Sequence, residues 1–167
     1  MLMLMRVLHI VLGSFWVGTL LFTAFFLFPA MRDAGPDGAK VGAQLMKRNF
    51  ANIMPAVATI AILAGIWLLY WTSGGFNNEY MKTKPAMAYS VGGLAAIIAL
   101  VIGLITVRPS MIKAMKLGQA AASAPPAEQQ KMQAEAGALR ARAGKANLWI
   151  ALLLLITVIA MAVGRYV

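Results

Sequence analysis

The sequence predicts an all-α bundle of four transmembrane helices, with a cytoplasmic helical hairpin that extends the third and fourth spans. Apolar residues make up 61% of the 167-residue chain, against about 45–50% in an average soluble domain. Charged residues make up only 12%, against about 25% in such domains. So small a chain could not bury that much apolar surface in a water-soluble core, so we expect lipid to surround it.

Four stretches contain no Asp, Glu, Lys or Arg: 7–28, 50–72, 85–107 and 146–164. A helix needs about 20 apolar residues to cross a hydrocarbon core about 30 Å thick, and each stretch has 19 to 23. The run Leu152–Ile156 does not alternate, which excludes a β-barrel. The first stretch is longer than a cleavable signal segment, so we interpret it as a retained helix.

Turn signals separate the spans. Ala34–Gly38 is a turn in the first loop, Ser73–Gly75 ends the second helix, and Pro85 fits the first turn of the third. The Arg108-Pro109 pair is expected to bend the third helix where it leaves the membrane.

The distribution of Lys and Arg predicts the orientation. Eleven of them lie in the loops 29–49 and 108–145, and four lie on the other side of the membrane. The positive-inside rule places these two loops in the cytoplasm of a bacterium and both termini outside its inner membrane. This topology accounts for the net charge of +10, so nucleic acid is not an expected partner.

The region 108–145 is predicted to form a helical hairpin that turns at Ser123–Pro126. Its second arm carries one apolar face at helical spacing: Met132, Ala136, Leu139 and Ala143. The hairpin is interpreted either as a plain stalk or as a docking surface for a partner.

Small residues form narrow stripes on two spans, and close packing at such stripes joins helices in lipid. One stripe comprises Ala58, Ala61 and Gly65, and the other comprises Gly92, Ala96, Ala99 and Gly103. Both are predicted helix–helix contacts.

The first span carries the one histidine of the chain, His9, on a stripe that continues through Gly13, Trp16, Leu20, Thr23 and Leu27. An ionisable residue within the membrane indicates a functional site. Three hypotheses stand for His9: a neutral imidazole bonded to a hydroxyl or backbone carbonyl, a ligand of haem iron or copper, or a proton relay.

Other candidate ligands lie near the outer face. Met3 and Met5 precede His9 and carry thioethers, which suit Cu(I), although methionine also serves as apolar filler. Lys82 and Lys84 precede the third span as interfacial anchors or as contacts for the carboxylates of a ligand such as haem. Trp16 is a further candidate cofactor contact.

Familiar catalytic sets are absent. No Asp or Glu lies in the four stretches, no phosphate-binding loop or Ser-His-Asp set occurs, and the chain has no cysteine. The sequence therefore favours a non-enzymatic role.

Arg6-Val7-Leu8-His9-Ile10 and Phe15-Trp16-Val17-Gly18 resemble the opening helix of CopD-like membrane proteins. The resemblance continues through Met54-Pro55-Ala56 and Gly65-Ile66-Trp67-Leu68 and covers about two-thirds of the chain. It implies a role in copper resistance or import, with copper or haem handled through His9.

The layout is also similar to HemJ-type protoporphyrinogen oxidases, which implies functional roles for His9 and for Lys82 or Lys84. A third hypothesis is a non-catalytic accessory subunit of a larger membrane complex. The expected partners are the lipid bilayer and other membrane subunits or a second copy of the chain.

Overall fold

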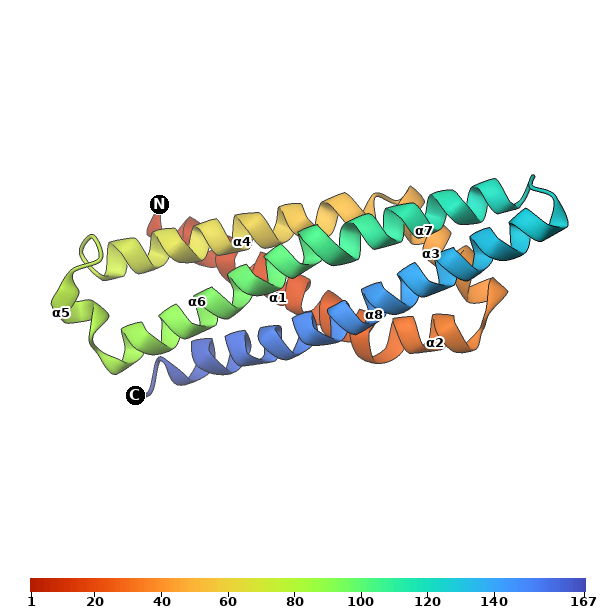
Figure 1. Ribbon diagram of the computed structural model, residues 1–167. Helices are drawn as coiled ribbons and strands as arrows, with labels where there is room; N and C mark the ends of the chain where they lie inside the picture. The colour runs from red at the N-terminus through yellow and green to blue at the C-terminus, as the bar shows by residue number, and fades with distance from the viewer.

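The computed structural model describes all 167 residues, and every regular element in it is helical (Figure 1). The elements, in chain order, are α1 (Leu2–Phe22), the π-helical segment η1 (Thr23–Leu27), α2 (Phe28–Asp33), α3 (Pro36–Lys47), α4 (Phe50–Thr72), α5 (Asn78–Met81), α6 (Lys84–Ile102), the π-helical segment η2 (Gly103–Val107), α7 (Arg108–Ala121) and α8 (Pro126–Val163).

Four helices are long and apolar enough to cross a membrane: Leu2–Asp33, Phe50–Thr72, Lys84–Ala121 and Pro126–Val163. The last two contain 38 residues each, or about 57 Å at the usual rise, well beyond the roughly 30 Å of a hydrocarbon core. The third and fourth helices therefore continue past the bundle as a hairpin. These findings confirm the predicted fold class, and the fold is that of a multi-pass membrane protein.

Both chain termini and α5 lie at one end of the bundle, which we call the termini end (Figure 1). The α2–α3 connection and the turn between α7 and α8 lie at the other, which we call the basic end. This arrangement follows from four helices that alternate in direction along the chain.

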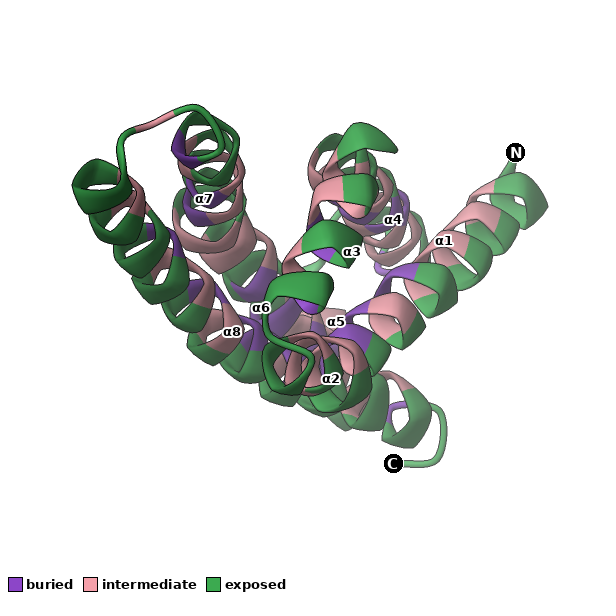
Figure 2. Cartoon of the chain, turned by 90° about the vertical axis from the view of Figure 1, so that its right-hand side faces the viewer, coloured by how far each residue is buried: buried purple, intermediate pink, exposed green.

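The helices pack as two antiparallel pairs. Helix α1 packs chiefly against α4, and the helix formed by α6, η2 and α7 packs chiefly against α8. Seen from the basic end, α2 and α3 lie between the two pairs (Figure 2). Small residues allow this close approach, as predicted: Ala58, Ala61, Gly92, Ala96 and Ala99 are all buried.

The core is a narrow seam between the pairs. It comprises Trp16, Leu20, Met54, Ala58, Ala96, Ala99, Ile150 and Leu154. Large apolar side chains elsewhere face outward, among them Phe26 at 67% exposed and Ile105 at 68%. An outward apolar surface around a thin core suits lipid and not water as the surrounding solvent.

Each π-helical segment ends two residues before a proline. Segment η1 precedes Pro29, and η2 precedes Pro109. Proline has no N–H, and its ring collides with the carbonyl four residues earlier, so a widened turn keeps the helix continuous. The helix thus passes through Pro109, and the irregularity is a π-turn in the residues before it.

Two features differ from the predicted elements. The first helix runs from Leu2 to Asp33, several residues beyond the charge-free stretch at each end. The first loop contains a helix of its own, α3, which follows a tight turn at Gly35 with φ of 56°. Gly38 lets α3 lie against α2, because a Cβ there would stand 1.8 Å from the Met31 carbonyl oxygen.

Candidate functional site

His9 lies on α1 near the termini end, where its ring packs against α4. Its Nδ1 lies 2.7 Å from the backbone carbonyl oxygen of Ala61. A carbonyl only accepts, so Nδ1 is the donor in this bond, and a neutral ring then leaves Nε2 with a free lone pair. This geometry agrees with the hydrogen-bonded hypothesis for His9 and is also the arrangement that orients metal-ligating histidines.

Gly65 makes room for the imidazole. A Cβ at Gly65 would lie 2.7 Å from Cε1 of His9 and 2.9 Å from Nδ1. Since Gly65 follows Ala61 by one helical turn, the same stretch of α4 supplies both the acceptor and the space. The small-residue stripe on the second span therefore positions the histidine as well as the helices.

The two candidate methionines lie differently with respect to His9. Met5 precedes His9 by four residues, so it shares that face of α1 one turn closer to the termini end, and it is half-buried. Met3 is 81% exposed, and its separation of six residues along the helix places it roughly 120° around α1 from His9. The helix thus brings Met5, and not Met3, beside the imidazole.

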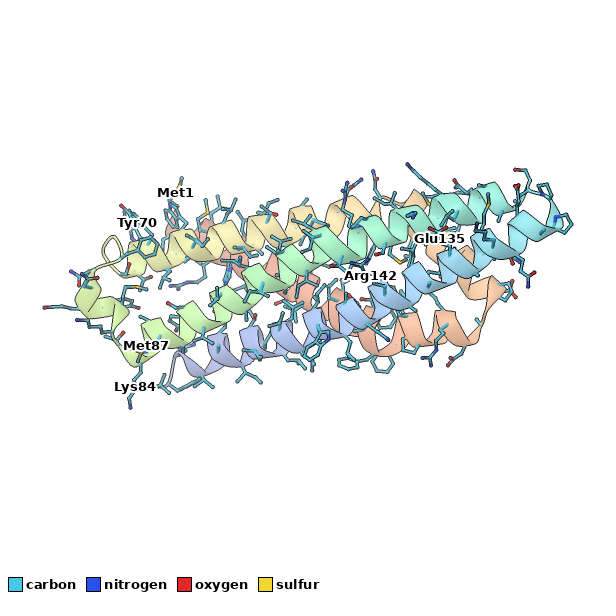
Figure 3. All side chains as sticks on the ribbon, in the orientation of Figure 1. Met1, Tyr70, Lys84, Met87, Glu135 and Arg142 are labelled. Atoms are coloured by element: carbon cyan, nitrogen blue, oxygen red, sulfur yellow. The ribbon has the colours of Figure 1, made fainter.

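Lys82 and Lys84 lie on the connection from α5 into α6, and both are exposed. Neither side chain forms a hydrogen bond or an ion pair, including with Glu79. Lys84 projects away from the bundle, on the opposite side of the termini end from Met1 (Figure 3). Neither lysine is hydrogen-bonded to His9, whose ring bonds to the Ala61 carbonyl oxygen.

Trp16 lies two turns deeper than His9 and is 5% exposed. It borders a half-open cavity of about 80 Å³ between the two helix pairs, which lies toward the basic end. The walls are mostly apolar, with Leu20, Met54 and Ile150 beside the indole. His9 is not among the lining residues. The stripe that begins on α1 therefore contributes to two separate sites: His9 packs against α4, and Trp16 borders the cavity.

A buried polar pair lies in the wall of this cavity. The side-chain amide nitrogen of Asn147 donates to the Thr23 hydroxyl oxygen over 3.1 Å, and that hydroxyl donates to the Leu20 carbonyl oxygen over 2.9 Å. Asn147 and Thr23 are each only 2% exposed. In a membrane such a bond joins helices, here α8 to the first span.

At the basic end of the cavity, Arg108 reaches across from α7 to α4. Its guanidinium donates twice to the Asn52 side-chain oxygen, over 2.9 and 3.3 Å. Sequence reasoning did not single out Asn52 or Asn147. The available signal for Asn147 was its position as an amide side chain near the start of the charge-free stretch 146–164.

Neither of the two hollows described fits a haem held by the candidate residues. Cofactor-sized ligands occupy pockets of about 300–1,000 Å³, whereas the cavity beside Trp16 is about 80 Å³. A second, larger hollow at the basic end is not lined by His9, Lys82 or Lys84. Of the candidate residues for a haem, only Trp16 lines either of these two hollows.

The chain also contains no cluster of three His, Asp or Glu side chains that could hold a metal ion. Any metal at His9 would depend on one nitrogen and on softer donors.

No family model, no curated protein and no solved structure matches the chain.

Proposed function

We propose that this chain is a copper-handling, multi-pass protein of a bacterial inner membrane, as its resemblance to CopD-like proteins implies. Its basic end faces the cytoplasm, in accordance with the positive-inside rule. His9 then lies near the outer face and receives copper(I) from that side. Copper is the cargo in this proposal and not a resident cofactor.

The observation that carries the proposal is the hydrogen bond from His9 Nδ1 to the Ala61 carbonyl oxygen. It selects the tautomer in which Nε2 is the donor atom for a metal and holds the ring at a fixed angle on α4. The thioether of Met5, one turn nearer the membrane surface, supplies a second, soft ligand of the kind that Cu(I) prefers.

The absence of acidic residues from the spans supports cuprous and not cupric ion. Carboxylate ligands are missing from the spans, while His9 and Met5 carry nitrogen and sulfur donors. A site of this kind binds one ion with modest affinity and releases it again, which suits transfer more than storage.

Competition with a chromophoric Cu(I) chelator under reducing conditions tests the proposal. The wild-type protein in detergent should bind one Cu(I) per chain. His9→Ala should weaken binding at least tenfold, and Met5→Leu should weaken it less. Met87→Leu is the matched control, because Met87 is an exposed methionine on α6, and it should behave as wild type.

Equal copper binding by wild type and His9→Ala would refute the proposal. The proposal would also be refuted if the wild-type protein removed no Cu(I) from the chelator. Elution of each variant as a single folded peak in size-exclusion chromatography separates loss of the ligand from loss of the fold.

A further inference from the structure

A cleft of about 540 Å³ lies at the basic end, between α2–α3 on one side and α7–α8 on the other. Its lining includes Phe28, Arg32, Arg140, Lys145 and Leu148. The cleft adjoins the cavity beside Trp16, because Phe28 and Met111 line both hollows. It lies at the opposite end of the molecule from His9, so what it binds is independent of the copper proposal.

Three cations line the cleft and no acid does: Arg32, Arg140 and Lys145. Arg32 touches the exposed carboxylate of Asp33, but Arg140 and Lys145 form no ion pair. Farther out on the same hairpin, Lys113 pairs with Glu135 over 2.7 Å. The cleft thus contains two cations, Arg140 and Lys145, that no acidic residue of the chain neutralises.

Apolar and basic residues follow the same order along both walls. On the first span Phe28 lies toward the membrane and Arg32 one turn farther toward the basic end. On α8, which runs in the opposite direction, Leu148 lies toward the membrane, Lys145 beyond it and Arg140 beyond that. The cleft is therefore apolar where it meets the lipid tails and cationic where it meets the headgroup zone.

Two glycines on α8 border open space in the cleft. A Cβ built at Gly137 or Gly144 meets no atom within 4 Å, and both glycines line the cleft. Because that space is empty and both residues are helical, neither position needs glycine for packing or for backbone geometry, although helical glycine costs about 1 kcal/mol relative to alanine. Their effect is to leave room for an occupant.

We propose that this cleft binds one anionic phospholipid of the inner leaflet. The phosphodiester binds to Lys145 and to Arg140, whose guanidinium lies beside Gly118 of α7, with Arg32 as a third cation in the lining, and an acyl chain runs along Phe28 and Leu148. Basic pockets between transmembrane helices on the cytoplasmic side bind anionic headgroups in this way. Arginine adds paired, planar hydrogen bonds to phosphate oxygens.

Native mass spectrometry of the full-length protein, with phosphatidylglycerol or phosphatidylcholine added to the detergent, tests this proposal. Wild type should retain one phosphatidylglycerol and bind phosphatidylcholine at least tenfold more weakly. Arg140→Gln with Lys145→Gln should lose that preference. Lys116→Gln with Lys131→Gln removes the same charge from exposed residues outside the cleft and should keep it.

A second variant fills the space without removing charge. Gly144→Leu places a side chain in the open cleft and should displace the retained phosphatidylglycerol while the protein melts at or above the wild-type temperature. Retention by Gly144→Leu, or an equal loss of lipid in the two double variants, would overturn the proposal. Full displacement of the lipid by millimolar inorganic phosphate would also overturn it, because the cleft would then be a small-anion site.

Discussion

The imidazole of His9 packs against Gly65, at a place where no other residue would leave it room. Tyr89 packs in the same manner against Gly164, where a Cβ would lie 2.6 Å from Cε1 of the ring. In each antiparallel helix pair, one ring-bearing side chain thus packs against a glycine of the other helix near the termini end. Each pair also carries a π-turn before a proline toward the basic end. The two pairs therefore share these two backbone features, although the residues that form them differ.

Gly65→Ala should displace the His9 ring and break its bond to Ala61. Overpacking of this kind costs about 1–3 kcal/mol, which thermal unfolding in detergent would report as a lower midpoint. Gly18→Ala is the control, since a Cβ at Gly18 meets nothing within 4 Å, and its midpoint should equal or exceed that of wild type. Identical midpoints for the two variants would contradict the packing described.

The bond between Asn147 and Thr23 should appear as a coupling energy in a double-mutant cycle. Asn147→Ala and Thr23→Val together should be less destabilising than their sum by about 0.6 kcal/mol, and by about 1.7 at most, as for other bonds between helices in membranes. Asn147→Ala with Thr157→Val is the control, because Thr157 bonds elsewhere, and these two changes should add. A coupling of zero for the first pair would show that the bond does not form.

Gly38→Ala should push α3 away from α2, because the new methyl group would meet backbone and not a flexible side chain. We expect trypsin to cleave at Lys40 and Lys47 several-fold faster in this variant, as measured by limited proteolysis in detergent. Gly137→Ala, which adds a methyl group in open space, should leave the cleavage rate unchanged. Unchanged cleavage in Gly38→Ala would mean that α3 does not rest on α2.

The proposed orientation predicts the activity of reporter fusions in a bacterium. Alkaline phosphatase needs an oxidising compartment to form its disulfides, so a fusion after Val167 should be active. A fusion inserted at Ser123, in the turn between α7 and α8, should be inactive. The reverse pattern would invert the topology and place His9 on the cytoplasmic side.

Much of the fold could be predicted because lipid imposes one strong constraint. Four charge-free stretches of sufficient length indicated four helices, and the second helix has the predicted bounds, Phe50–Thr72. The stripes of small residues indicated the packed faces of the second and third spans. Three residues of the stripe on the first span, Trp16, Leu20 and Thr23, are buried in the structure.

The remaining features depend on residues that are distant in sequence. Asn147 finds its partner 124 residues away, and no local pattern connects them. The three cations of the cleft come from α2 and α8, which are more than 90 residues apart in the sequence. Helix α3 itself was missed because its glycines and proline indicated only a turn.

The single histidine makes the central claim directly measurable, because ¹⁵N NMR of the labelled protein in lipid nanodiscs contains one pair of imidazole signals. In the neutral ring we predict a proton on Nδ1 and none on Nε2, and one equivalent of Cu(I) should shift the Nε2 signal while Nδ1 keeps its proton. A ring protonated at Nε2, or signals that do not move when Cu(I) is added, would contradict the account.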